Sequence, residues 1–160
     1  MWQTYIIENG VLRTLGVGEN HNYGCNGIGP WLFEFASFDM ANDFNGEKIK
    51  SIATSDGRGS YIVLTEDGNL YGWGPDNKLG IGNENSTLER KVIPITTISD
   101  VEEIIGGKGF FIVRKKDGSV WATGNNENGV LGRWIGIDRK TRGSKYQTAY
   151  EWVECPELEI

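Results

Sequence analysis

The chain has 160 residues, the usual size of a single domain, and a formal net charge of −6. The 22 acidic residues outnumber the 16 basic ones, which argues against a nucleic-acid-binding protein because phosphate contacts need clustered Lys and Arg. One His and two Cys exclude a His/Cys metal cluster and a disulfide framework, although a single disulfide bridge stays open. Residues 1–5 show neither a basic segment nor a long apolar run, so no secretory signal is predicted, and no stretch approaches a membrane span.

A tight turn recurs three times along the chain, each time as an Asn-Gly or Asp-Gly pair between apolar segments. The copies are Asn9-Gly10, Asp67-Gly68 and Asp117-Gly118, at intervals of 58 and 50 residues. Such a pair is typical of a β-hairpin with a type I′ turn, in which both central residues have positive φ. Recurrence at this interval indicates repeated supersecondary units in which these six residues have a structural role.

Strands are predicted on both sides of each turn, which makes the chain all-β. In chain order they lie near residues 4–7, 11–15 and 31–35, then 49–53, 61–65, 70–73 and 92–95, then 101–105, 110–114, 120–123 and 150–155. The run Tyr61-Ile62-Val63-Leu64 is continuously apolar, whereas a strand covered on one face alternates apolar and polar residues. We therefore expect sheets that are packed on both faces.

A first insertion, residues 29–44, is rich in aromatic side chains. Its members Trp31, Phe33 and Phe35 alternate, which predicts an outer strand with one aromatic face. Either these rings belong to the core or cover an open sheet face, or they form a patch that binds a partner. The candidate partner-binding residues of this segment are Trp31, Phe33, Phe35, Phe38 and Phe44.

A second insertion, residues 133–146, is basic within an otherwise acidic chain. It holds five positive residues and one acid. A solvated loop is one interpretation, and an electrostatic contact with an acidic partner is the other, including the acid-rich residues 151–159 of a neighbouring copy. The candidate partner-binding residues here are Arg133, Trp134, Arg139, Lys140 and Arg142.

Catalysis finds little support in the sequence. The one histidine, His21, lies in a glycine-rich turn, where hydrogen bonding to local backbone is the expected role. Residues 106–109 read GGKG but lie between two predicted strands with no following helix, unlike a phosphate-binding loop. The acidic residues show no spacing that commits a pair to acid and base chemistry. We predict no catalytic residue, no cofactor, no metal and no enzyme activity.

The repeat units continue alike after their turns. Residues 71–82 read YGWGPDNKLGIG and residues 121–132 read WATGNNENGVLG, with a looser copy at 16–24. On these residues the chain resembles the regulator of chromosome condensation repeat family, although the family's second-strand histidine has no counterpart. The resemblance implies a β-propeller whose units each form one four-stranded antiparallel blade. It implies a single repeat domain, residues 1–160, with units at about 1–46, 47–99 and 100–160, and so a partial propeller of about three blades.

A partial propeller has open ends. Complete propellers close with four to eight blades, and closure covers the strand edges and the blade faces. About three blades leave two outer faces uncovered, and the apolar strands predict that both faces are apolar. The predicted partners are therefore other proteins or further copies of the chain, including a homodimer in which two chains complete one ring.

The predicted function is a noncatalytic structural or adaptor subunit that docks into a multi-protein assembly. Members with such repeats occur in microbial and phage surface proteins, so by analogy the assembly is expected to be a virion, in its head, tail or baseplate. The chain is otherwise expected in the cytoplasm, without nucleic-acid binding or membrane insertion. The alternatives are a soluble inhibitor or regulator of another enzyme, a guanine-nucleotide exchange factor and a glycan-binding module.

Overall fold

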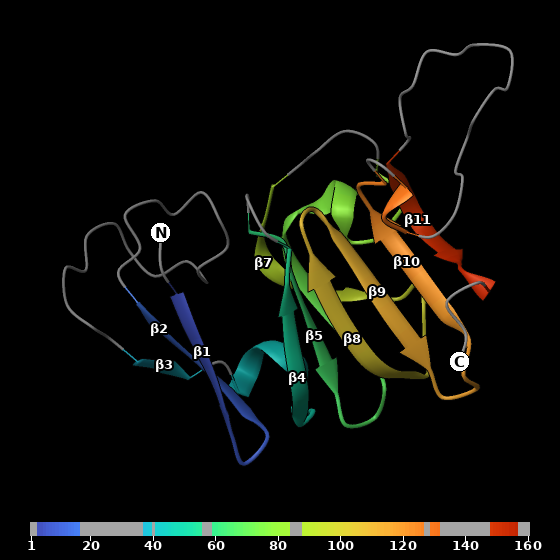
Figure 1. The fold of residues 1–160 in the computed structure, drawn as a ribbon. Coiled ribbons are helices and arrows are strands. Elements are labelled where there is room, and N and C mark those ends of the chain that lie inside the picture. The colour runs from blue at the N-terminus through green and yellow to red at the C-terminus, as the bar shows by residue number, and fades with distance from the viewer. Residues whose placement is uncertain are drawn as a thin grey trace, which may run out of the picture.

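The computed structural model describes residues 3–16, 37–39, 41–55, 59–83, 88–126, 129–131 and 148–156. These residues form eleven β-strands in three antiparallel sheets, with short 3-10 helices at Ala41–Phe44 and Asp76–Lys78 (Figure 1). The prediction of an all-β chain built from four-stranded antiparallel units is confirmed.

Each sheet is a meander in which strands adjacent in the chain pair with one another. The first sheet contains β1 (Gln3–Glu8), β2 (Val11–Gly16) and β3 (Ser37–Asp39). The second contains β4 (Ile49–Thr54), β5 (Tyr61–Thr65), β6 (Leu70–Pro75) and β7 (Leu88–Ile95). The third contains β8 (Val101–Gly107), β9 (Phe110–Lys115), β10 (Val120–Gly124) and β11 (Ala149–Glu154). The predicted strands match these positions except in the first sheet, where β3 follows the segment 31–35, which lies outside the described residues.

The second sheet lies between the other two and is covered on both faces (Figure 1). Strand β5 shows this residue by residue, since Ile62 and Leu64 pack in a core shared with the third sheet and Val63 packs in a core shared with the first. All three side chains are completely buried. The continuous apolar run of β5 thus reflects a sheet with two covered faces, as predicted.

The turn between β1 and β2 has the type I′ form predicted for it. Asn9 and Gly10 have φ of 53° and 78°, so both central residues are left-handed. Glu8 pairs with Val11 across the turn. Asn is among the few residues other than glycine that adopt this conformation readily, because its short side chain can bond to the local backbone.

The Asp-Gly turns of the other two sheets are built differently. Gly68 and Gly118 have φ of 90° and 89°, but Asp67 and Asp117 are not left-handed. The amide of Gly68 donates to the carbonyl of Thr65 at 3.1 Å, as in a type I turn followed by a left-handed glycine. The type I′ prediction is therefore wrong for these two turns, because the loop holds three residues and only the glycine needs positive φ.

The first two turns also contact the following sheet. The carbonyl of Gly10 accepts a hydrogen bond from the amide of Ile49 at 2.8 Å, and the carbonyl of Gly68 accepts one from the amide of Val101 at 3.1 Å. Ile49 and Val101 are the first residues of β4 and β8, the strands that begin the second and third sheets. The same backbone bond therefore joins each sheet to the next.

Candidate protein-docking surface

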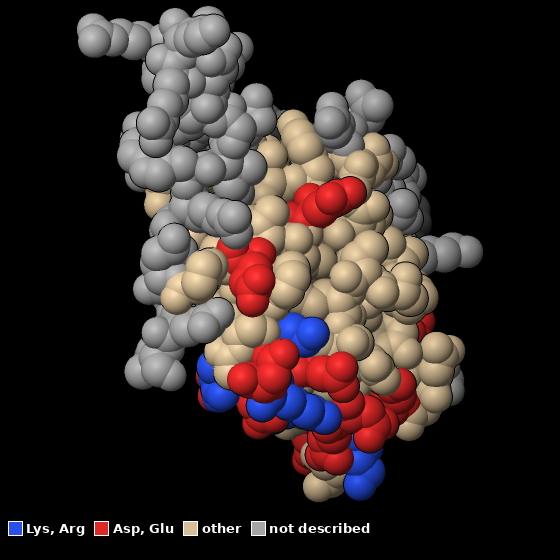
Figure 2. Space-filling model, turned by 90° about the vertical axis from the view of Figure 1, so that its right-hand side faces the viewer, with Lys and Arg blue, Asp and Glu red and all other residues tan. Residues whose placement is uncertain are grey.

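An apolar row crosses the outer face of the third sheet, which points away from the second sheet. The register aligns four residues, one on each strand: Ile105, Ile112, Ala122 and Val153. Ile105 is 61% exposed, whereas Ala122 is 0% exposed, and the partly buried Ile112 and Val153 pack against a buried cluster that includes Ala122 and Leu131. Figure 2 views the molecule from the side of β10 and β11 and shows a broad uncharged surface, with most acidic and basic side chains gathered at its lower end. The exposed end of this row, at Ile105, marks a candidate protein contact.

The second sheet has an equivalent row, and there the row forms the surface on which the next sheet packs. There the register aligns Ala53, Ile62, Gly72 and Ile93, again one residue on each strand. The third sheet packs on this row, and Ile62 is 0% exposed. The outer face of the third sheet is thus the same kind of surface, and no sheet formed by the described residues covers it.

The outer face of the first sheet is polar. Tyr5 packs toward the second sheet, so its neighbours on β1 that alternate with it, Thr4, Ile6 and Glu8, belong to the outer face. Thr4 and Glu8 are exposed, Ile6 is 45% exposed, and Nε of Arg13 lies 3.9 Å from Oε2 of Glu8. The prediction that both end faces are apolar is therefore wrong for the first sheet, where an exposed ion pair flanks Ile6.

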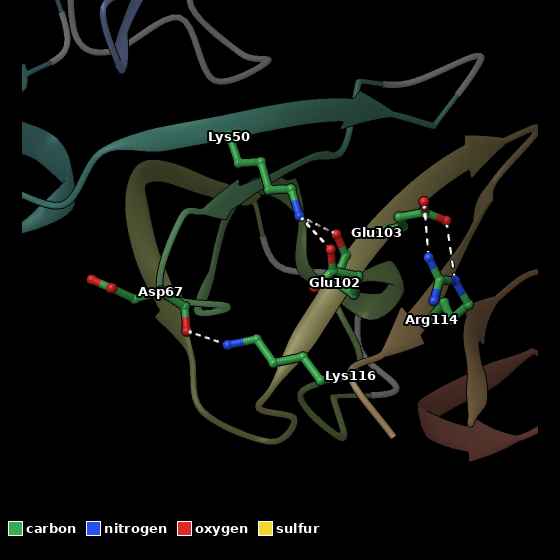
Figure 3. A network of polar contacts seen from close by, with 6 residues as sticks. All are labelled: Lys50, Asp67, Glu102, Glu103, Arg114 and Lys116. Carbon is green, nitrogen blue, oxygen red and sulfur yellow. Dashed lines mark hydrogen bonds and ion pairs between the residues drawn. The ribbon is translucent and has the colours of Figure 1, made fainter. Parts of the chain in front are cut away.

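Polar contacts join the second sheet to the third at the end of the molecule where the turns lie (Figure 3). Nζ of Lys50 on β4 lies 2.8 Å from the backbone carbonyl of Glu102 on β8 and 2.9 Å from its Oε1. Nζ of Lys116 donates to the carbonyl of Asp67 at 3.4 Å. The hydrogen bond from Lys50, aided by its charge, lowers the pKa of Glu102 from the ordinary 4.5. Both contacts cross between the sheets and so oppose their separation.

A further ion pair lies on the outer face itself, beside the apolar row. Nη2 of Arg114 lies 2.9 Å from Oε1 of Glu103, and its Nε donates to Oε2 at 3.2 Å. This hydrogen bonding lowers the pKa of Glu103 and raises that of Arg114. The two residues are opposite each other in the register, two positions along the strands from Ile105 and Ile112. A protein bound on the apolar row would lie beside this ion pair. Charges on that protein that complement the pair would favour one orientation of binding.

Most candidate residues of the two insertions lie outside the described residues. This holds for Trp31, Phe33, Phe35, Arg133, Trp134, Arg139, Lys140 and Arg142. Phe38 lies on β3, opposite Thr14 of β2. Phe44 is 1% exposed, and its ring meets that of Tyr71 edge-on with the ring centroids 5.5 Å apart. Phe44 is therefore a core residue and not a partner contact, which agrees with the first of the two interpretations of that segment.

A hollow of about 430 Å³ lies where the second and third sheets meet. Its lining includes Trp121, Trp152, Lys115 and Glu151. Nζ of Lys115 lies 5.9 Å from the centroid of the Trp121 ring, close enough for an attraction between the cation and the ring face. Trp152 is nearly buried and belongs to the core between the two sheets. The hollow thus lies between the second and third sheets, and its walls include both apolar and charged side chains.

The described residues offer little for metal chemistry. No three His, Cys, Asp or Glu side chains gather there into a possible metal site. Cys155 is buried, and Cys25 and His21 lie outside that part of the chain. Nor do the described residues contain a helix long and apolar enough to cross a membrane.

Solved structures of other proteins show the fold class of the chain. No family model matches the chain. In solved structures, yeast RCC1 (Prp20) bound to Kap60 superposes with a TM-score of 0.65 at 12% identity, over 96% of this chain and 35% of that one. Human WBSCR16 superposes with a TM-score of 0.59 at 20% identity, over 77% of this chain and 31% of that one. The three meandering sheets are thus blades of a β-propeller.

Sequence relatives identify the family. The chain is 32% identical over 129 residues to the human E3 ubiquitin-protein ligase HERC2, covering 79% of this chain and 3% of that protein. It is 27% identical over 123 residues to the mouse regulator of chromosome condensation, covering 72% of this chain and 29% of that protein. The chain belongs to the regulator of chromosome condensation repeat family, and it spans about a third or less of the length of these relatives.

The apolar row was not among the residues that the sequence singled out. The signal was present, because the strands at 101–105 and 110–114 were predicted and continuous apolar runs indicated two covered faces. Which face is covered inside the chain depends on the number and order of the sheets. That information is not carried by any single strand.

Proposed function

We propose that this chain is a noncatalytic protein-interaction module that docks into a larger assembly through the outer face of its third sheet. The observation that carries the proposal is the apolar row, which runs across all four strands and includes Ile105 at 61% exposure. Burying a whole side chain of this kind contributes about 1.5 to 3 kcal/mol, so covering the exposed part of Ile105 alone would contribute about 1 to 2 kcal/mol.

Relatives of this fold support a protein as the partner. The solved yeast RCC1 (Prp20) is bound to Kap60, and a second structure of the protein is described together with its binding to Gsp1p and histones. These partners belong to that protein, and they favour a protein ligand for this chain without naming it. A virion as the assembly, residence in the cytoplasm, and inhibition, nucleotide exchange or glycan binding stay predictions from the sequence.

The test compares the two end faces in the same chain. The protein is purified from its natural source with its partner bound and weighed by native mass spectrometry, beside the variants Ile105→Glu and Ile6→Glu. We expect Ile105→Glu to release a chain of 17.8 kDa and Ile6→Glu to keep the complex. A complex that survives Ile105→Glu, or a wild-type chain that is monomeric in its source, would overturn the proposal.

A further inference from the structure

We propose that the hollow at the joint between the second and third sheets binds a small zwitterionic ligand, either a free amino acid or a short peptide, with an apolar side chain. The volume of about 430 Å³ lies toward the lower end of the range of about 300 to 1,000 Å³ that is typical of ligand pockets, so it suits a ligand of this size. The hollow is separate from the outer face of the third sheet, because Trp121 and Trp152, which line it, pack in the core between the two sheets.

The apolar part of the lining comes from four side chains. Trp152 and Ile98 are 8% and 9% exposed, whereas Trp121 and Ile81 are half-buried. Neither indole has its N–H directed to a ligand. Nε1 of Trp121 donates to Oγ of Ser119 at 3.0 Å, and Nε1 of Trp152 is buried without a hydrogen-bond partner among the described residues. Both rings therefore offer apolar surface, which suits an aliphatic or aromatic side chain of the ligand.

Two side chains of opposite charge complete the lining. Lys115 is half-buried and Glu151 is exposed, and neither forms an ion pair with another described residue. The ammonium group of Lys115 can donate hydrogen bonds to a carboxylate, and the carboxylate of Glu151 can accept them from an ammonium group. A ligand that carries both groups can pair with both charges, whereas a ligand with one charge leaves one side chain of the site unpaired.

Hydrogen bonds hold the walls of the hollow in place. Oγ1 of Thr97 donates to the carbonyl of Gly80 at 2.9 Å, which ties the segment between β7 and β8 to the segment that follows β6. The amide of Gly82 donates to the carbonyl of Tyr150 at 2.9 Å, which ties the latter segment to β11. Walls that are fixed by such bonds lose less conformational entropy when a ligand binds.

The test titrates the full chain with two probes, L-phenylalanine and the dipeptide glycyl-L-phenylalanine. NMR follows the indole N–H signals of Trp121 and Trp152, and we expect both signals to shift, with a Kd of about 1 mM for the amino acid. The probe that binds more tightly distinguishes a free amino acid from a short peptide as the ligand. Phenylpropanoate, which lacks the ammonium group, and phenylethylamine, which lacks the carboxylate, should each bind about twofold to tenfold more weakly than phenylalanine.

Variants of the two charged residues assign each charge to its partner. Lys115→Gln should weaken the binding of phenylalanine by about twofold to tenfold and leave that of phenylethylamine unchanged. Glu151→Gln should weaken the binding of phenylalanine to a similar extent and leave that of phenylpropanoate unchanged. Lys116→Gln is the matched control, because it removes the same charge from the next residue, which does not line the hollow. It should bind phenylalanine like the wild type.

If neither probe shifts the signals of Trp121 and Trp152, the proposal is wrong. It is equally wrong if phenylpropanoate and phenylethylamine bind as tightly as phenylalanine, or if Lys115→Gln and Glu151→Gln bind phenylalanine like the wild type. Ile105→Glu, on the outer face, should leave the binding of phenylalanine unchanged. Loss of the natural partner in that variant tests docking through the outer face, so the two proposals fail separately.

Discussion

Replacing two isoleucines in equivalent positions tests whether a covered blade face contributes more to stability than the outer face of the third sheet. Ile62 on β5 and Ile112 on β9 each occupy the second strand of their apolar row. Ile62 is 0% exposed because the third sheet packs on it, whereas Ile112 is only partly buried. The same substitution, Ile→Ala, therefore removes the same atoms from a closed core at one site and from a partly covered face at the other, where Ile112 packs against the buried Ala122 and Leu131.

The expected losses follow from that difference. Ile62→Ala leaves a cavity between two sheets that can relax only in part, which costs about 2 to 5 kcal/mol. Ile112→Ala removes atoms that pack against Ala122 and Leu131 but are partly hydrated, so we expect a smaller loss of about 1 to 2 kcal/mol. With a urea slope of about 2 kcal/mol/M, the two unfolding midpoints should differ by about 0.5 to 1.5 M.

Urea unfolding followed by tryptophan fluorescence measures both variants under the same conditions. The slope should stay at the wild-type value, since a change would mean that the surface exposed on unfolding had changed. Equal losses at Ile62 and Ile112 would refute the reasoning, because the outer face of the third sheet would then be as well covered as the inner joint. A larger loss at Ile112 would refute it as well.

Three further predictions address the core and the polar contacts. Gly106→Ala should destabilise the chain by about 1 to 3 kcal/mol in urea, because its Cβ would collide with the backbone of Thr54 in the neighbouring sheet; no loss would mean that β8 and β4 are further apart. Phe44→Ala should cost about 3 to 5 kcal/mol in the same assay, and a loss below about 1 kcal/mol would remove it from the core. Lys50 lowers the pKa of Glu102 in the fold, so the carboxylate stabilises the fold above pH 4.5, and this contribution disappears as the pH falls through the lowered value. Glu102→Gln should therefore lessen the fall in Tm below pH 4.5, and an unchanged Tm profile would contradict the pairing.

The repeated turns carried most of what could be predicted about the fold. Asn9-Gly10 between apolar strands predicted a two-residue hairpin, and the backbone has that form. The apolar run Tyr61-Ile62-Val63-Leu64 predicted two covered faces, and its residues divide between two cores. Both predictions depend on residues close together in the chain, where backbone conformation and strand alternation decide the outcome.

The sequence left the outcome open, or predicted it wrongly, where it depends on more than the local pattern of residues. Phe44 sits in an aromatic segment that fits either a core or a binding patch, and only its contact with Tyr71 assigns it to the core. Asn9 and Asp67 are each followed by a glycine. The loop at Asp67 is one residue longer, however, so only its glycine has a positive φ. The exposure of Ile105 follows from the absence of a covering sheet among the described residues, which no local pattern encodes.

Unequal repeats still build equal joints, because the same two backbone groups meet in each joint. Gly10 and Ile49 are 39 residues apart, and Gly68 and Val101 are 33 apart, yet both pairs make the same backbone hydrogen bond. The glycine turn and the first residue of the next sheet set the geometry, and the loops between them vary freely. The features that the two joints share are therefore the glycine turn, the buried apolar residue that opens the next sheet and the core that packs between the two sheets.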